Sequence, residues 1–231
     1  MQYKLQFRSM LFSSLMIATF FTILITGQTP SQPQTAVLNP ATAPISYGLI
    51  VDGSLSLKEQ HASIKEAAKI IIGDSKKDDE IFLVTFTNSN NIEMLQEFTQ
   101  DKEDLLVALE KGFPNIYYGK SSIIDALYVC ADYLLKSTNN RRVLILITDG
   151  IEEGSTYKLD QLVARLRTKQ IPVFILGAAG LVKEKYGEKV YREAIKLLKE
   201  LPEQTQGQAI IAYQEQELAT KAKEVLNLVR K

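Results

Sequence analysis

From Ser46 onwards, short strand-like runs alternate with longer stretches in which apolar residues recur at helical spacing. The strand-like runs are mostly β-branched, aromatic or alternating in polarity; they are Tyr47–Val51, Ile81–Phe86, Glu93–Phe98, Arg142–Thr148, Ile171–Leu176 and Gln208–Ala212. The amphipathic stretches have the spacing of helices; they are Leu57–Ile72, Asp101–Lys111, Ser122–Leu135, Thr156–Thr168, Lys185–Leu201 and Gln216–Val229. The segment Asn88–Asn91 is a turn sequence, so the strands on either side of it are predicted to pair as a hairpin.

This alternation predicts the fold class. Strands separated by helices of ten or more residues imply right-handed βαβ crossovers. Arg142–Thr148 is the most continuous apolar run of this region, as expected of a central strand that is buried on both faces. We therefore expect one α/β domain over residues 46–231. It would be a three-layer, doubly wound (Rossmann-like), mostly parallel sheet with one antiparallel edge strand and helices on both faces.

The first 45 residues are expected to lie outside this domain. Lys4 and Arg8 precede the apolar run Met10–Thr26 and no acidic residue comes before it, which is the pattern of a secretory signal. The run is long for a cleaved signal and short for a membrane-spanning helix. Residues 1–27 are thus predicted to be a signal peptide, with an uncleaved N-terminal anchor as the alternative. Residues 28–45 are uncharged and rich in Pro, Thr and Gln, which predicts an extended linker.

Composition excludes several classes of function. Among 231 residues, 27 Lys and Arg balance 27 Asp and Glu, so no long-range field attracts nucleic acid. We expect no nucleic-acid partner, and membrane contact only through the N-terminal segment. The single Cys130 and the single His61 cannot form a disulfide framework or a structural zinc site. One histidine also leaves little room for Ser–His–Asp catalysis.

The loops after the first and fourth predicted strands carry the most informative residues. Asp52 ends the first of these strands and Asp149 ends the fourth. In doubly wound sheets, ligands bind outside the carboxyl ends of the strands. If the two strands are neighbours, the two carboxylates converge at one crevice, where like charges either raise a pKa or recruit a cation.

Hydroxyl groups lie in the same loops. Ser54 and Ser56 are two residues apart in a tight loop before a helix, so both hydroxyls can turn to the same point, and the loop Gly119–Ser122 offers a third hydroxyl. Hydroxyl and carboxylate oxygens are hard ligands that suit an octahedral Mg²⁺. The sequence therefore predicts a Mg²⁺ site, with Mn²⁺ as the alternative ion.

Three segments resemble one known family. Asp52–Ser56 (DGSLS) resembles the D-x-S-x-S motif that opens the metal-ion-dependent adhesion site of the von Willebrand factor type A domain. Gly119–Leu127 is similar to the family's segment GGTALYDAI, and Ile147–Gly150 matches its TDG segment. The three segments occur in the family's order, and the resemblance covers residues 46–231. It places the chain near secreted or membrane-tethered bacterial members, which implies a periplasmic or extracellular location or a tether to the inner membrane.

The resemblance also implies roles for individual residues. Ser54, Ser56 and Ser121 would bind the metal directly, while Asp52 and Asp149 would hold it through water. One coordination position would then stay open for an Asp or Glu carboxylate of a partner protein.

Two departures from the family pattern affect this assignment. The family usually has Thr at the position of Ser121 and Gly at that of Lys120. Ser keeps the hydroxyl but lacks the methyl group that restrains its rotamer. Ser122 could also replace Ser121, so the third hydroxyl ligand stays open between these two residues.

The residues before this loop suggest a rim for the partner. Tyr117 and Tyr118 precede Lys120 in the chain. The tyrosines could pack under the loop or surround a partner's acidic side chain. Lys120 could be an ordinary solvated charge or could attract a carboxylate to the open position.

Each candidate ligand also has a purely structural explanation. Ser56–Glu59 has the pattern of a capping box and Ser122–Asp125 that of a shorter version, so either serine could close a helix N-terminus. Asp149–Gly150 could form a turn. Caps and turns do not need to share a crevice, so the placement of all three on converging loops favours metal binding.

The sequence therefore predicts an exported binding module rather than an enzyme. One alternative is a Mg²⁺-dependent phosphohydrolase on a similar sheet. An enzyme that forms an aspartyl phosphate would need a second acid two residues after Asp52, where Ser54 stands. The other alternative is a scaffold whose site holds no metal.

Overall fold

A computed structural model of the chain describes residues 6–7, 43–113 and 119–231. The predicted signal or anchor segment and the linker lie outside the described residues, apart from residues 6–7 and 43–45. Within the described ranges, no helix combines the length and the apolar character needed to span a membrane.

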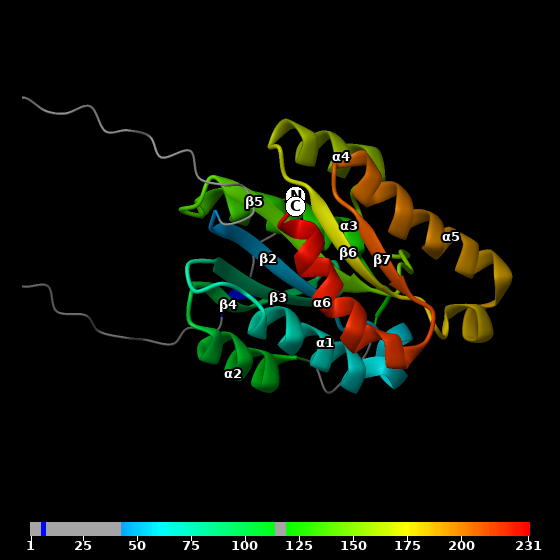
Figure 1. Cartoon of the computed structure of the whole chain (residues 1–231). Helices are drawn as coiled ribbons and strands as arrows, with labels where there is room; N and C mark the ends of the chain where they lie inside the picture. The colour runs from blue at the N-terminus through cyan, green and yellow to red at the C-terminus, as the bar shows by residue number, and fades with distance from the viewer. Residues whose placement is uncertain (1–5, 8–42, 114–118) are drawn as a thin grey trace, which may run out of the picture.

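The sheet has the strand order β1-β4-β3-β2-β5-β6-β7 within the described residues (Figure 1). All neighbouring strands pair in parallel except β3 and β4, which form the predicted antiparallel hairpin. Only the two-residue β1 lies beyond β4. The strands are β1 (Gln6–Phe7), β2 (Ile45–Asp52), β3 (Glu80–Asn88), β4 (Asn91–Thr99), β5 (Arg141–Thr148), β6 (Val173–Ala178) and β7 (Ala209–Ala212).

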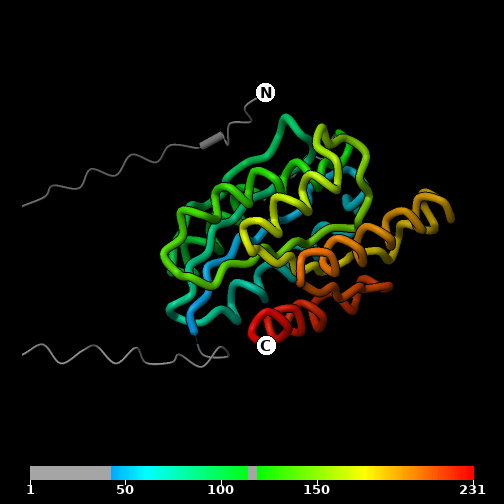
Figure 2. Tube along the Cα trace, turned by 90° about the horizontal axis from the view of Figure 1, so that it is seen from above, coloured from blue at the N-terminus to red at the C-terminus, as the bar shows by residue number. Residues whose placement is uncertain are grey.

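Helices cover both faces of the sheet, so the predicted three-layer α/β fold is confirmed (Figure 2). Side chains of α1, α2 and α6 share one core with the sheet, and those of α3, α4 and α5 share the other. The helices are α1 (His61–Gly73), α2 (Lys102–Gly112), α3 (Ile123–Tyr133), α4 (Leu159–Thr168), α5 (Val182–Gln204) and α6 (Leu218–Val229). Short 3₁₀ turns are η1 (Leu55–Gln60), η2 (Leu134–Lys136) and η3 (Glu215–Glu217).

The central strands are buried on both faces, which explains why their sequences are apolar at successive positions and do not alternate. In β5, Val143, Ile145 and Ile147 pack into the core under α1 and α6. Leu144 and Leu146 face the opposite core, under α3 and α4. Both faces are therefore buried, as the continuous run Arg142–Thr148 predicts for a central parallel strand.

Element boundaries differ from the predicted ones where a local contact ends the regular structure. The predicted helix Lys185–Leu201 begins earlier, at Val182, and is interrupted at Gly187, whose φ of +81° is not helical. The predicted strand Ile171–Leu176 begins at Val173, because the Ile171 N–H is bonded back to the Leu166 carbonyl at the end of α4. Such contacts form between elements or at their ends and leave little trace in the periodicity of a sequence.

Gly207 is essential for the approach of β7 to β6. A Cβ atom at this position would lie 1.8 Å from the Val173 carbonyl oxygen, a backbone atom that cannot move aside cheaply. Gly207→Ala is therefore expected to lower the free energy of unfolding by about 2 kcal/mol in chemical denaturation. Gly73→Ala is the matched control, because nothing lies within 4 Å of its added Cβ at the end of α1. Equal stability of the two variants would contradict this packing.

Candidate metal centre

The carboxyl ends of β2 and β5 bring the two predicted aspartates to the same edge of the sheet. β2 and β5 are hydrogen-bonded parallel neighbours, with Val51 opposite Ile147. Asp52 directly follows Val51, and Asp149 lies two residues after Ile147. The two aspartates are 0% and 1% exposed. Two adjacent buried carboxyl groups are costly unless something compensates their charge.

Asp52 ties three loops together. Its Oδ2 accepts hydrogen bonds from Thr148 Oγ1 at 2.6 Å and from Ser121 Oγ at 3.2 Å. Its Oδ1 accepts the backbone N–H of Ser54 at 2.9 Å, and Ser54 Oγ lies 3.2 Å from Ser56 Oγ. The loops after β2 and β5 and the loop before α3 therefore meet at this carboxylate, as the sequence predicts.

Asp149 has one satisfied carboxylate oxygen and one without a partner. Oδ1 accepts the backbone N–H of Ile151 at 2.9 Å, which is the turn expected of an Asp-Gly sequence. Oδ2 is buried and has no hydrogen-bond partner among the described residues. The turn therefore accounts for Oδ1 only, and Oδ2 is an unpaired hydrogen-bond acceptor in the interior.

Burial raises the pKa values of both carboxyl groups, and repulsion from Asp52 adds to the shift of Asp149. Desolvation and then the negative charge of Asp52 raise the pKa of Asp149 to about 7, although the Ser56 hydroxyl and the Ile151 N–H act in the opposite direction. Desolvation also raises the pKa of Asp52, against the hydrogen bonds from Thr148 and Ser54. A cation between these groups would relieve both penalties.

The donor set fits a hard divalent cation. It consists of serine hydroxyls and carboxylate oxygens, which suit Mg²⁺ or Mn²⁺. Within the described residues, no three His, Cys, Asp or Glu side chains gather closely enough to hold a metal by themselves. A metal at this edge would therefore depend on the hydroxyls of Ser54, Ser56 and Ser121.

The surroundings of the two adjacent serines distinguish them. Ser121 Oγ is hydrogen-bonded to Asp52. Ser122 Oγ instead lies 2.9 Å from Ser89 Oγ in the turn between β3 and β4, and 3.4 Å from the Lys120 carbonyl oxygen. Of the two, Ser121 is the residue whose hydroxyl joins the cluster.

The alternative of simple helix caps does not describe these serines. Ser54 is the N-cap residue of η1 and Ser122 that of α3, and neither makes a capping hydrogen bond through its side chain. Ser56 lies inside η1, not at its start. The side-chain hydroxyls of these serines therefore do not cap the helices that follow them.

Two acidic side chains, the buried Asp125 and the half-buried Glu152, hold the loop after β5 against the start of α3. Asp125 accepts the N–H groups of Thr156 and Tyr157 at 2.9 and 3.0 Å. Glu152 accepts the N–H groups of Ile124 and Ser155 at 3.0 and 2.9 Å. Because α3 begins only two residues after Ser121, these carboxylates position Ser121 relative to Asp149. The bonds that join the two segments connect residues 28 to 32 positions apart, so they leave no local pattern in the sequence.

Asp125→Asn is expected to destabilise the fold by about 2 kcal/mol, because the amide of the buried Asn would have only one acceptor oxygen for two N–H groups. Asp132→Asn, on the same helix, is the control: Asp132 is 49% exposed and forms surface ion pairs, so its loss should cost less than about 1 kcal/mol. Urea denaturation measures both, and similar losses in the two variants would contradict the positioning role of Asp125.

The predicted rim is described only in part. Tyr117 and Tyr118 lie outside the described residues, and Lys120 is exposed in the loop before Ser121. Two other exposed apolar residues lie at this edge: Leu55, 51% exposed, is in the DGSLS loop, and Tyr186 is 43% exposed. Desolvation raises the pKa of Tyr186 most, Lys185 lowers it, and the charge of Asp149 adds to the rise. No pattern marks Tyr186 in the sequence, because it lies in a charged run that is typical of a solvated helix start.

Comparison with known proteins gives the same family as the motifs. A model of the von Willebrand factor type A domain matches residues 48–220. No curated protein sequence matches the chain significantly.

Several solved structures share the fold. An aerotolerance-related membrane protein from Bacteroides fragilis superposes with a TM-score of 0.60 at 16% identity, over 80% of this chain and 98% of that one. BatB from Bacteroides thetaiotaomicron gives 0.58 at 14% identity, over 81% and 100%. Proximal thread matrix protein 1 from the mussel byssus gives 0.63 at 18% identity, over 81% and 48%.

Proposed function

Because this chain belongs to the von Willebrand factor type A domain family, whose members are typically protein-interaction modules, we propose that it is a metal-dependent binding module. Its ligand would be an Asp or Glu carboxylate on the surface of a partner protein. The metal would be Mg²⁺, with Mn²⁺ as the alternative. Ser54, Ser56 and Ser121 would bind it directly, and Asp52 and Asp149 would hold it through water.

The unpaired, buried Oδ2 atom of Asp149 carries this proposal. It lies at the same edge as the buried Asp52, and a purely structural turn would leave such an atom uncompensated. A divalent ion bound here would supply the missing positive charge and an open position for an external oxygen.

The residues of the chain set the geometry of this capture. Asp52 holds Ser121 and the Ser54 backbone in one arrangement through hydrogen bonds of 3.2 and 2.9 Å. Such preorganised oxygens lose little conformational entropy on binding an ion. A partner carboxylate then replaces water in the open position, and the fit of the surrounding surfaces determines which carboxylates bind well.

We also propose that the module is exported and acts in the periplasm or outside the cell, either free or tethered to the inner membrane. The basic residues and apolar run of the N-terminal segment support this location. So does the likeness to a structure described as a membrane protein. Fractionation of cells that express the full chain tests it, and recovery of the chain in the cytoplasm would contradict it.

Metal-dependent capture tests the proposed function. The immobilised full chain should retain a partner protein from an envelope fraction in Mg²⁺ and release it when a chelator is added. Asp149→Asn should retain none, while Asp132→Asn should behave as the parent protein. Capture that is insensitive to the chelator and to Asp149 would contradict the proposal.

The same protein should not hydrolyse a panel of phosphoesters in Mg²⁺. No acid stands two residues after Asp52, where an aspartyl-phosphate enzyme needs one. Metal-dependent hydrolysis that is lost in Asp52→Asn would favour the phosphohydrolase alternative instead.

A further inference from the structure

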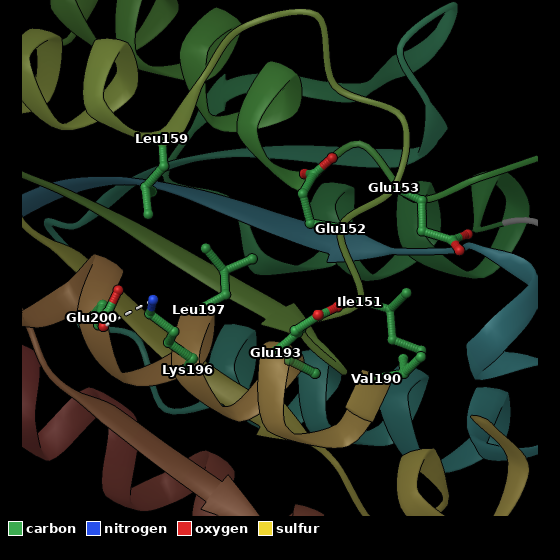
Figure 3. Close-up of a pocket in the computed structure, with 11 residues that line it drawn as sticks. Ile151, Glu152, Glu153, Leu159, Val190, Glu193, Lys196, Leu197 and Glu200 are labelled. Carbon is green, nitrogen blue, oxygen red and sulfur yellow. Dashed lines mark ion pairs between the residues drawn. The ribbon is translucent and has the colours of Figure 1, made fainter. Parts of the chain in front are cut away.

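A cavity of about 300 Å³ lies beside the loop of the candidate metal centre. It is bounded by the residues after β5, by the start of α4 and by the middle of α5 (Figure 3). Leu159 of α4 and Leu197 of α5 point toward one another across it. Ile151 and Val190 complete an apolar floor.

Acidic side chains surround this floor. Glu153, Glu193 and Glu200 line the cavity, and Lys196 is the one basic residue among the residues that line it. Lys196 and Glu200 are 3.8 Å apart with exposed side chains, so their ion pair is weak and exchangeable. Glu153 and Glu193 have no ion-pair partner in the described part of the chain. The rim therefore carries a net negative charge, with one lysine against the three glutamates.

Glu152 also lines the cavity but has a different task. Its carboxylate accepts hydrogen bonds from Ile124 N, Ser155 N, Ser155 Oγ and Gly154 N. Both oxygens are thus occupied by the loop itself. The carboxylates that can meet a ligand are those of Glu153 and Glu193, together with that of Glu200 when it exchanges its weak ion pair with Lys196.

We propose that this cavity receives an arginine side chain of the partner protein. The three-carbon stem of arginine would lie against Leu159 and Leu197, and the guanidinium would reach the glutamates of the rim. Its planar, multiply donating head can serve two carboxylates at once, which an ammonium group does less well. The inference rests on the proposed function, since the same partner would place its carboxylate at the metal centre.

Other occupants fit the cavity less well. A phosphate or a second acidic group would be repelled by the rim. A neutral apolar group would desolvate the glutamates without compensation. A divalent ion lacks ligands, because no three acidic, His or Cys side chains within the described residues are grouped to hold one.

The cavity lies next to the candidate metal centre along the chain. Gly150 and Ile151 line the cavity and follow Asp149 directly, and the Ile151 N–H is bonded to Asp149 Oδ1. Gly150 has a φ of +84°, and a Cβ there would lie 2.8 Å from the Ala194 carbonyl oxygen of α5. The loop therefore packs directly on the cavity wall, and one partner segment can reach both places. The expected recognition motif is an acidic residue followed or preceded closely by an arginine.

A direct test uses N-acetyl-arginine amide and its neutral isostere N-acetyl-citrulline amide. In NMR titrations of the full chain with labelled methyl groups, the arginine probe should shift the signals of Leu159, Val190 and Leu197, with or without a chelator. The citrulline probe should not. The double variant Glu193→Gln, Glu200→Gln should bind the arginine probe about fivefold more weakly. Both residues lie at the surface, so the fold should be unaffected.

Glu203→Gln is the matched control, since Glu203 is exposed on the same helix but does not line the cavity. Equal shifts with both probes, or equal losses in Glu203→Gln and the double variant, would overturn the proposal. So would methyl shifts that appear on raising the protein concentration alone, which would indicate a second copy as the occupant.

Peptides with one aspartate and one arginine, joined by glycine spacers of increasing length, connect the two sites. In Mg²⁺, the best of them should bind about fivefold more tightly than its citrulline counterpart. If Mg²⁺ itself binds but the arginine probe causes no shifts, only the cavity proposal is wrong. If the arginine probe causes the shifts but Mg²⁺ does not bind, the metal-dependent function is wrong, and with it the two-point recognition.

Discussion

Asp149→Asn is expected to abolish Mg²⁺ binding and at the same time to stabilise the metal-free protein by about 2 kcal/mol at pH 8. The substitution keeps the acceptor for the Ile151 N–H, which Asp149 Oδ1 provides. It removes the charge that lies unpaired beside Asp52 in the interior. A residue whose replacement increases stability while it removes binding is maintained for function, not for the fold.

The pH dependence follows from the direction of the pKa shift. The pKa of Asp149 is raised from 3.8 to about 7 by folding, so the folded chain binds a proton more tightly than the unfolded chain. The metal-free protein therefore loses stability as the pH rises from about 4 to about 7, and the full penalty is present above that window. The gain from Asp149→Asn should be largest at pH 8 and vanish near pH 4.

Urea denaturation in chelator at several pH values measures this difference. In Mg²⁺, the parent protein should gain stability with metal concentration and the variant should not. Asp132→Asn should follow the parent protein throughout. A variant that is less stable than the parent at pH 8, or that still binds Mg²⁺, would contradict the assigned role of Asp149.

Ser121→Ala is expected to weaken Mg²⁺ binding about 100-fold or more, whereas Ser122→Ala should change it less than about threefold. Only Ser121 Oγ is bonded to Asp52, while Ser122 Oγ lies beside Ser89. Calorimetric titration with Mg²⁺ distinguishes the two variants. Denaturation in chelator should show that both retain the fold.

Ser121→Thr provides the complementary test. Threonine keeps the hydroxyl and restricts its rotamers, so binding should be retained or strengthened. If Ser122→Ala weakens binding as much as Ser121→Ala, or if Ser121→Thr abolishes it, Ser121 is not the third hydroxyl ligand.

Most of the fold could be predicted because it follows from periodicity. A sheet buried on both faces requires apolar runs such as Arg142–Thr148, and the turn Asn88–Asn91 marks the hairpin. The interruption of α5 at Gly187 was not predicted, since the charged residues around it also suit a solvated helix. The sequence did not predict that β2 and β5 are neighbours, because strand order depends on long-range packing.

The candidate site could be predicted in composition but not in detail. The motifs predicted that Asp52, Ser54 and Asp149 lie at one edge of the sheet. The choice between Ser121 and Ser122 depends on Ser89, which lies more than thirty residues earlier and has no pattern that connects it to the loop. The supporting carboxylates of Asp125 and Glu152 were missed for the same reason. Their bonds join segments that only the fold places together.

The central claim is that hydroxyl and carboxylate oxygens at the carboxyl edge of the sheet bind one divalent ion. Calorimetric titration of the metal-free full chain with Mg²⁺ at neutral pH tests it most directly. The prediction is a single binding event that is absent in Asp149→Asn, with a matching rise in the denaturation midpoint of the parent protein. No heat in the parent protein and no shift of its midpoint on addition of Mg²⁺ or Mn²⁺ would contradict it.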